Sequence, residues 1–365
     1  MNHITIIAGA RPNFMKVAPI IHEIKKRKAE GVDIDYSLVH TGQHYDKKMS
    51  GDFFEQLNIP EPDANLSAGG GTQAEQTGAI MIRFEEHLRN NPTDLVLVVG
   101  DVTSTMACAI TSQKLKIKVA HVEGGIRSND WGMPEEINRI ITDRVSDILF
   151  CSTENAIMNL KKEGFDNFHE KKIINTGDIM FDASIFYADR GIKKSKQLDG
   201  EFILCTFHRA ENTDNDYNLL TILKAINEIG KKIKIIFPIH PRTKSKIEVI
   251  NINYKKEYLN IDFIDPLGYI DMISYIKNSI YVITDSGGLQ KEAFFMKKMC
   301  LTLRNQTEWV ELVESGYNYL CEIDFNKILE ANSKILTISK SFQENFYGDG
   351  NTGNKIINEL KKNLK

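Results

Sequence analysis

The chain has 365 residues, of which 42 % are hydrophobic and 26 % are charged, a composition that is ordinary for a folded protein. A chain of this length forms about two domains and has enough apolar residues for a sizeable core, which excludes global disorder. Its 46 basic and 49 acidic residues give a net charge of -3, so we expect no nucleic-acid partner.

The apolar stretches and the cysteines carry information about the compartment. The longest apolar stretches, such as residues 95–99, are far shorter than the roughly 20 residues of a membrane span. Residues 4–7 resemble a strand rather than part of a signal peptide. The five cysteines are an odd number without CxxC spacing, which favours core positions over metal or redox sites. We therefore predict a cytoplasmic protein without a membrane partner.

Short β-branched apolar runs alternate with longer helical patterns along the whole chain. The runs that predict strands are residues 4–8, 36–40, 94–99, 118–121, 148–151, 202–207, 233–237, 261–264 and 280–284. Apolar residues at three- and four-residue spacing, such as Phe14, Val17 and Ile21, predict helices between these runs. Fully apolar strands that are separated by helices indicate parallel sheets covered on both faces.

This alternation predicts an α/β fold with two Rossmann-like, doubly wound domains that face a central cleft. The last element of the first domain is expected near residues 173–177. We therefore place the first domain at residues 1–175 and the second at residues 176–349.

A basic cluster follows the first predicted strand. Gly9, Ala10, Arg11 and Pro12 end that strand and begin a helix, and Lys16 lies one turn further. Proline suits the start of a helix, and a helix N-terminus beside two cations favours an anion. The cluster therefore predicts an anion site.

The loop after the second predicted strand contains His40 and His44 with HxxxH spacing, and Gln43 lies between them. Zinc needs further ligands, and the sequence offers no obvious ones, so we expect polar loop contacts and no metal site. The chain has no GxGxxG motif, which leaves a nicotinamide cofactor without support.

Carboxylates follow three consecutive predicted elements. Asp101 and Glu123 each follow a strand, and Glu135 and Glu136 follow the next loop. Each carboxylate alone is compatible with helix capping or solvent exposure. Carboxylates that share one cleft raise one another's pKa, so such a group can work as acid and base.

The second domain carries residues that suit an anion. His208 and Arg209 follow its first strand, His240 follows the second, and the run 284–288 leads from a strand into a helix. In that run Ser286 is placed to cap the helix, and two glycines allow a phosphate to approach the backbone amides. Together the two domains predict a nucleotide-linked substrate bound between them.

The sequence resembles the non-hydrolysing UDP-N-acetylglucosamine 2-epimerases, which have a glycosyltransferase-B-like fold. The resemblance extends over nearly the whole chain. It is carried by Gly9-Ala10-Arg11-Pro12 with Lys16, Gly100-Asp101, the run 121–128, the Pro-Glu-Glu-Ile-Asn-Arg run at 134–139, the run 284–292 and Tyr347-Gly348-Asp349-Gly350.

The resemblance implies interconversion of UDP-GlcNAc and UDP-ManNAc by anti elimination of UDP to a glycal and its re-addition, without a cofactor. It also implies a homodimer, a role in making precursors of cell-surface polysaccharides, and a C-terminal helix at residues 350–365 that packs on the first domain. The implied catalytic residues are Asp101, Glu123, Glu135 and His208. The implied substrate-binding residues are Arg11, Lys16, Gln43, Arg127, Arg209, His240, Ser286, Gly287, Gly288, Glu292 and Arg304.

Three segments depart from the family pattern. The first has Asn13 in place of a glutamate, and the second has Thr307-Glu308-Trp309-Val310-Glu311 in place of Thr-Glu-Arg-Pro-Glu. Both resemble a branch of the family that acts on modified sugars such as UDP-2,3-diacetamido-2,3-dideoxyglucuronate. Residues 45–49 differ from those of members that a second substrate molecule activates.

Other functions stay open at this point. Gly124-Gly125 resembles the hydrolysing 2-epimerases. A glycosyltransferase of the same fold would need an acceptor site, and a UDP-sugar sensor would lack an intact set of carboxylates.

Overall fold

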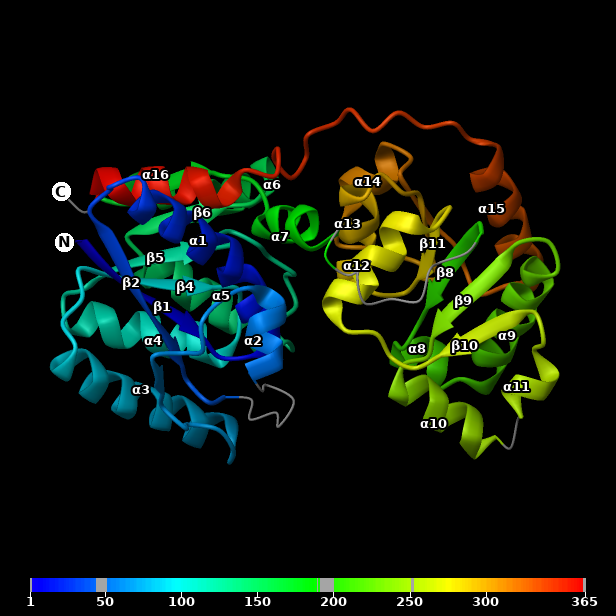
Figure 1. Ribbon diagram of the computed structural model, residues 1–365, viewed down its shortest axis with the longest axis horizontal. Helices are drawn as coiled ribbons and strands as arrows, with labels where there is room; N and C mark the ends of the chain where they lie inside the picture. Colours follow the sequence, from blue (N-terminus) through cyan, green and yellow to red (C-terminus); the bar gives the residue numbers. More distant parts are fainter. Residues whose placement is uncertain (1, 44–50, 189, 191–199, 251–252, 364–365) are drawn as a thin grey trace. The chain divides into compact units, whose positions relative to one another are not determined.

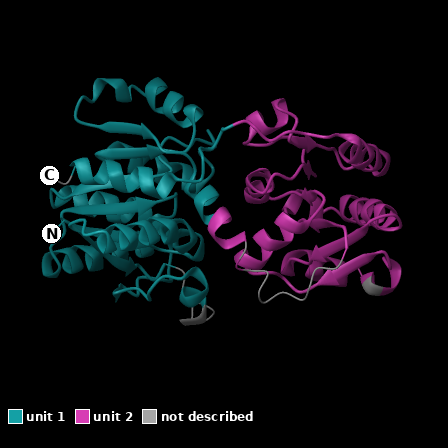
Figure 2. Cartoon of the chain, turned by 45° about the horizontal axis from the view of Figure 1, so that its top comes forward, with its two compact units in different colours: residues 1–183, 345–365 teal, residues 184–344 magenta. Residues whose placement is uncertain are grey.

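The computed structural model describes residues 2–43, 51–188, 190, 200–250 and 253–363. His44 and the variant segment 45–49 lie outside these residues. The chain divides into two compact units, which are unit 1 (residues 1–183 and 345–365) and unit 2 (residues 184–344), coloured teal and magenta in Figure 2. No helix of the described chain is both long and apolar enough to cross a membrane.

The boundary of unit 1 lies eight residues beyond the predicted position of 175. Hydrogen bonds explain this difference, because the Asp182 carboxylate accepts from the backbone N–H of Thr352 (3.0 Å) and of Gly353 (2.8 Å). Asp178 also donates its backbone N–H to the carbonyl of Tyr347 at 2.8 Å. The segment after residue 175 is therefore attached to the C-terminal segment that returns to unit 1.

Unit 1 alternates strands and helices along the chain. Its elements are β1 (Asn2–Ala8), α1 (Arg11–Ala29), β2 (Ile34–His40), α2 (Gly51–Leu57), β3 (Ala64–Asn65), α3 (Gln73–Asn90), β4 (Leu95–Val99), α4 (Thr103–Lys114), β5 (Lys118–Val122), α5 (Pro134–Val145), β6 (Ile148–Cys151), α6 (Glu154–Lys162), the 3-10 helix η1 (Phe165–Asn167), β7 (Lys172–Asn175), the first part of α7 (Ile179–Ala188) and α16 (Thr352–Asn363).

The described strands of unit 1 form one parallel sheet in the order β3-β2-β1-β4-β5-β6-β7. Helices α1 and α16 lie on one face of this sheet, and α3 and α4 lie on the other (Figure 1). Both faces are therefore covered, which explains why β4 is apolar and buried at every position.

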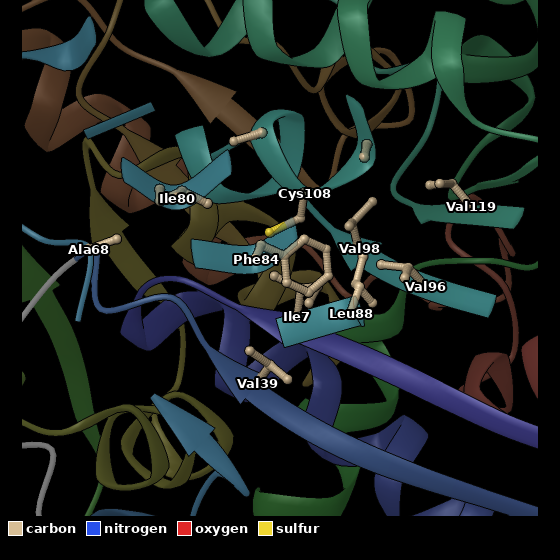
Figure 3. Close-up of a cluster of buried hydrophobic side chains, with 12 residues drawn as sticks. Ile7, Val39, Ala68, Ile80, Phe84, Leu88, Val96, Val98, Cys108 and Val119 are labelled. Carbon is tan, nitrogen blue, oxygen red and sulfur yellow. The ribbon is translucent and has the colours of Figure 1, made fainter. Parts of the chain in front are cut away.

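One core cluster of unit 1 lies between the sheet and helices α3 and α4 (Figure 3). Val96 and Val98 of β4 point into this cluster, together with Phe84 of α3 and Cys108 of α4. Cys108 and the other four cysteines are buried and free. Burial raises the pKa of the Cys108 thiol, so it behaves as a small apolar side chain.

Unit 2 repeats the alternation with shorter strands. Its elements are β8 (Phe202–Thr206), α8 (Ala210–Thr213), α9 (Asp216–Gly230), β9 (Lys234–Pro238), α10 (Pro241–Val249), α11 (Tyr254–Glu257), β10 (Ile261–Ile264), α12 (Tyr269–Asn278), β11 (Val282–Thr284), α13 (Gly287–Phe295), β12 (Cys300–Thr302), α14 (Val310–Glu314), β13 (Asn318–Leu320) and α15 (Phe325–Thr337).

The described strands of unit 2 form a second parallel sheet in the order β10-β9-β8-β11-β12-β13. Strands β12 and β13 of this sheet and β3 of the other have no counterpart among the predicted strands. Each of these strands has only two or three residues, and such a short run carries no readable period.

Each sheet reverses its strand order at one point, between β1 and β4 in unit 1 and between β8 and β11 in unit 2. Ligands of doubly wound folds bind beyond the carboxyl ends of the strands at such a point. Asp101 follows β4, and Asp285 follows β11. The fold therefore gives each unit one polar region at the same topological position.

Candidate active site

In unit 1, Asn13 fixes the turn that leads from β1 into α1. Its Oδ1 accepts hydrogen bonds from the backbone N–H of Gly9 (3.1 Å) and Ala10 (3.0 Å), and its Nδ2 donates to the carbonyl of Val99 (3.2 Å). The side chain is buried, so these bonds are shielded from water. Asn13 thus links the start of α1 to the end of β4.

Lys16, one turn further along α1, forms an ion pair with Glu123, and its Nζ lies 2.5 Å from Oε2. Side-chain exposure is 18 % for Lys16 and 9 % for Glu123, so the pair is largely removed from solvent. Burial alone disfavours the charged ammonium. The carboxylates of Glu123 and Asp101 outweigh that effect, and the pKa of Lys16 is raised. Lys16 is therefore a fixed cation beside two carboxylates.

Gly100 leaves room for this cluster. A Cβ at residue 100 would lie 3.1 Å from Lys16 Nζ and 3.4 Å from Glu123 Oε2, and the backbone φ is +69°. Any larger residue would push against the ion pair in a conformation that L residues rarely adopt.

Glu123 itself has a φ of +73°, which is uncommon for a residue with a side chain. Its backbone N–H and that of Gly124 both donate to the carbonyl of Phe150, at 3.0 and 3.1 Å. These bonds to β6 support a conformation that costs about 1 kcal/mol or more. Strain of this kind concentrates at functional sites, and here it directs the carboxylate toward Lys16.

Helix α5 supplies the partners of Asp101. Arg139 donates to Asp101 Oδ2 at 2.5 Å, and Asn138 Nδ2 donates to the Asp101 carbonyl at 2.8 Å. The Asp101 side chain is still 31 % exposed. This carboxylate is therefore held by an arginine while part of it remains accessible.

Glu135 and Glu136 begin α5 but have different surroundings. Glu136 is 1 % exposed, and its carboxylate accepts from the backbone N–H of Ser128 and Asn129, both at 2.9 Å, and from Arg139. Burial raises its pKa, but these donors outweigh burial and the net pKa is lowered. Glu136 therefore fixes the preceding loop, whereas the half-buried Glu135 stays the catalytic candidate of the two.

Arg127 has a different position from the one that we expected for a substrate-binding residue. Its side chain is 3 % exposed and forms ion pairs with Asp143 (2.7 Å) and Glu163 (2.6 Å). Asp143 is fully buried and also pairs with His121, whose other ring nitrogen lies 2.8 Å from the Gly100 carbonyl. The guanidinium of Arg127 therefore holds this network together, and its contact with a substrate stays a prediction.

Gln43 and Arg11 lie near the ends of β2 and β1. Gln43 Oε1 accepts from the backbone N–H of Ser104 (3.0 Å) and from its hydroxyl (2.6 Å), so it caps the start of α4. The guanidinium of Arg11 stacks over the Phe53 ring at 4.8 Å. Both side chains are partly exposed, as a ligand contact requires.

Unit 2 is organised around Asp285, whose side chain has no exposed surface. Its carboxylate accepts from the backbone N–H of His208 (3.0 Å) and Arg209 (2.9 Å) and from Asn212 Nδ2 (2.9 Å). The Arg209 Nε donates to the Asp285 carbonyl at 2.9 Å. The loops after β8 and β11 are therefore tied together, and this fixes the direction of the His208 and Arg209 side chains.

The rings of His208 and His240 stack with centroids 4.7 Å apart. His240 Nδ1 accepts from the backbone N–H of Arg242 at 3.1 Å and so caps α10. Burial lowers the pKa of His240, and the neighbouring His208 adds to this effect. His240 is consequently held as a neutral ring, and the His208 side chain is 38 % exposed.

Helix α13 begins at Gly287, directly after the N-cap Ser286. The Gly287 carbonyl accepts from Trp309 Nε1 at 2.9 Å, and the Ser286 N–H donates to Thr284 Oγ1 at 3.0 Å. Ser286 is half-buried, and Gly288 is exposed. Glu292 lies further along the same helix and is 9 % exposed. A helix N-terminus with accessible amides is suited to a phosphate.

Arg304 follows β12 and is 10 % exposed. It forms ion pairs with Glu308 (2.9 Å) and Glu211 (3.9 Å).

The predicted site residues fall into two groups. Unit 1 brings Asp101, Glu123 and Lys16 together. Unit 2 brings together His208, Arg209 and His240, and Arg209 also lies beside the start of α13. Ser286, Gly287 and Gly288 form that start, and Glu292 lies further along the same helix. Among the described residues no group of three or more His, Cys, Asp or Glu side chains is arranged to hold a metal ion.

Four polar residues had no predicted role: the buried Asn13, Asp143 and Asp285, and the partly buried Arg139. Of these residues, Asp285 has the clearest signal in the sequence, because it lies directly between a buried strand and the start of a helix. Asp143 gave no signal, since its partner His121 lies 22 residues away in the sequence.

Two parallel α/β units, one with a cluster of carboxylates and a lysine and one with a helix start suited to an anion, define the class of doubly wound proteins to which this chain belongs. The family model for UDP-N-acetylglucosamine 2-epimerase matches residues 25–361.

A homologue of that enzyme from Methanococcus maripaludis is 46 % identical in an alignment that covers 99 % of this chain and 99 % of the homologue. The UDP-2,3-diacetamido-2,3-dideoxy-D-glucuronate 2-epimerase of Pseudomonas aeruginosa is 45 % identical over 99 % of this chain and 100 % of its own. The crystal structure of the UDP-GlcNAc 2-epimerase from Methanocaldococcus jannaschii covers 99 % of both chains at 39 % identity, with a TM-score of 0.87. That enzyme has also been solved in complex with UDP-GlcNAc and UDP.

The chain belongs to the UDP-N-acetylglucosamine 2-epimerase family. It is an epimerase, an isomerase, and it has the glycosyltransferase-B-like α/β fold that the resemblance implied.

Proposed function

We propose that the protein is a non-hydrolysing 2-epimerase that interconverts UDP-GlcNAc and UDP-ManNAc. The observation that carries the proposal is the pair of carboxylates, Asp101 and Glu123, beside the largely buried cation Lys16 at the reversal point of the sheet. Family membership and the UDP-GlcNAc complex of the relative from Methanocaldococcus jannaschii support it.

The residue types fit the elimination. A carboxylate takes the proton from C2 of the sugar, the C2–H electron pair forms the C1=C2 bond, and the C1–O bond breaks so that UDP leaves with that electron pair. UDP then adds back to C1, and a proton returns to C2 from the opposite face. Two residues are therefore needed, one to take the proton and one to return it, and the candidates for these two roles are Asp101, Glu123 and Glu135.

The leaving diphosphate needs charge stabilisation, because negative charge grows on it as the C1–O bond breaks. We assign this role to His208, with Arg209, Arg11 and Lys16. Ser286, Gly287 and Gly288 would hold phosphate oxygens, and Glu292 would accept hydrogen bonds from the ribose hydroxyls. Gln43, His240 and Arg304 stay candidates for further substrate contacts.

A second candidate substrate is UDP-2,3-diacetamido-2,3-dideoxyglucuronate. The relative from Pseudomonas aeruginosa is named for that sugar and is 45 % identical. Asn13 stands where the family has a glutamate, and its Nδ2 lies 3.6 Å from where a Cβ on Gly100 would be, within the carboxylate cluster. An amide at this position removes one negative charge, which favours a sugar that carries its own carboxylate.

We also propose, from the same family, a homodimer in the cytoplasm that supplies polysaccharide precursors. The five buried, free cysteines support a reducing compartment. Sedimentation of the purified protein tests the dimer, with a monomer mass as the contrary result.

Proton NMR in deuterated water tests the reaction. UDP-GlcNAc incubated with the protein should yield UDP-ManNAc that carries deuterium at C2, without free ManNAc. Free ManNAc together with UDP would identify a hydrolysing enzyme instead. Unchanged, fully protonated UDP-GlcNAc would refute this substrate, and the diacetamido sugar would then be the one expected to react.

A further inference from the structure

Glu308 lies in the loop between β12 and α14, and its carboxylate lies against the start of α13. Its Oε2 lies 2.9 Å from Arg304 Nη1, and its Oε1 lies 3.9 Å from Arg209 Nη2. A Cβ on Gly287 would collide with Oε1 and would lie 3.8 Å from the same Arg209 nitrogen. The carboxylate therefore fills the space between two guanidinium groups and the first residue of a helix.

These surroundings are those of a phosphate site. A helix N-terminus attracts anions through its amide groups and its dipole, and arginine pairs hold phosphate oxygens. Gly287 has no side chain, which allows an anion to approach the backbone closely. In this structure the anion beside Gly287 is the carboxylate of Glu308, a residue of the protein itself.

Glu308 is charged but not enclosed. Burial alone would raise its pKa, but its own backbone N–H, Arg304 and Arg209 outweigh burial and lower the pKa. The side chain is nevertheless 44 % exposed, so it can leave without opening the core. Thr307 and Trp309 on either side are fixed by hydrogen bonds to Gln290 (2.6 Å) and to the Gly287 carbonyl (2.9 Å). Rotation of the Glu308 side chain alone would therefore free the position.

We propose that Glu308 occupies the diphosphate position while the protein is free of ligand, and that the diphosphate of the UDP-sugar displaces it. The inference rests on the proposed function of unit 2 as the UDP-binding unit. Displacing Glu308 uses part of the free energy of UDP binding. The protein therefore binds UDP less tightly than a protein with the same hydrogen-bond donors but without the Glu308 carboxylate would. Return of the carboxylate in turn favours release of the nucleotide product.

Calorimetric titration with UDP and with uridine tests this inference. Glu308→Gln removes the competing charge, and Glu308→Asp keeps the charge but shortens the side chain by one methylene group. Both variants should bind UDP roughly tenfold more tightly than the wild type. Uridine has no phosphate to compete, so its affinity should stay the same in all variants. Glu314→Gln, an exposed change of the same charge on α14, serves as the control and should match the wild type.

The outcomes separate the possible errors. Unchanged or weaker UDP binding in both Glu308 variants would overturn the inference while leaving UDP binding itself intact. Tighter binding in Glu308→Gln but not in Glu308→Asp would indicate a general effect of charge and would also overturn it. A wild type and variants that bind neither UDP nor uridine would refute the proposed function, and this inference with it.

Discussion

Asp101 in unit 1 and Asp285 in unit 2 occupy the same topological position, after the strand that follows the reversal point of each sheet. Asp101 is 31 % exposed and paired with one arginine. Asp285 is fully buried, and its carboxylate accepts hydrogen bonds from two backbone N–H groups. Burial and hydrogen-bond partners thus separate a carboxylate that is available for chemistry from one that holds backbone in place.

The comparison extends to the two sites. Unit 1 places the carboxylates of Asp101 and Glu123 beside Lys16. In unit 2 the carboxylate of Asp285 is buried, whereas His208, Arg209 and a helix start remain accessible. We therefore expect changes to the carboxylates Asp101 and Glu123 of unit 1 to affect turnover, and changes to Asp285 of unit 2 to affect stability.

The largest effect is expected from Glu123→Gln, which removes one proton acceptor. Turnover should fall by about 10²–10⁴-fold, as for other losses of a general base. Deuterium incorporation at C2 measures the loss, and calorimetry should show UDP affinity within about twofold of the wild type. The exposed Glu86→Gln on α3 is the matched control. A loss of UDP affinity as large as the loss of turnover would contradict this separation between turnover and UDP binding.

Asp285→Asn should mainly destabilise unit 2. One carboxylate oxygen becomes an NH₂ group that faces N–H donors, which leaves buried donors without an acceptor and costs about 2–3 kcal/mol. The free energy of unfolding in urea measures this cost. Asp101→Asn is the counterpart in unit 1 and should change that free energy by less than about 1 kcal/mol. Similar losses in both variants would contradict the contrast between the two aspartates.

Glu136→Gln adds a test through pH. The pKa of Glu136 is lowered in the folded protein, so its carboxylate contributes stability above its ordinary pKa of about 4.3 and loses it as the pH falls through the lowered value. The variant should be about 1–3 kcal/mol less stable at pH 7, and this difference should shrink below about pH 4.3. Urea unfolding at several pH values measures it, and a difference that stays constant down to pH 3 would show another cause.

The smallest effect is expected from Arg209→Lys. Lysine keeps the charge but loses the Nε–H that donates to the Asp285 carbonyl, so the cation is less well oriented. UDP affinity should fall by about threefold to tenfold, and deuterium exchange at saturating substrate should fall by a similar factor, because Arg209 is proposed to stabilise the leaving diphosphate. A fall in UDP affinity without a change in turnover would instead limit Arg209 to substrate binding.

Sequence reasoning recovers much of the fold because each buried strand is an apolar run with a polar residue at its end. Residues 118–121 and 148–151 are such runs, and they form β5 and β6 nearly as expected. Strands of two or three residues, such as β12, were missed because their stability comes from neighbouring strands rather than from their own pattern.

The site was predictable only in part. Asp101 and Glu123 stand directly after strands, so their position follows from chain order. Arg127 and Glu163 form an ion pair across 36 residues, and no local pattern indicates that the arginine is enclosed. Glu308 likewise lies beside Gly287 through tertiary structure alone.

The return of the chain to unit 1 affects the order in which the protein is completed. Unit 2 is one continuous stretch, whereas unit 1 includes α16, whose Ile356, Ile357 and Leu360 are buried. Arg27 of α1 also donates to Asn354 at 2.6 Å. During synthesis from the N-terminus the sheet of unit 1 is made first, but its cover is made last. Unit 1 is therefore completed only after the whole of unit 2 has been translated.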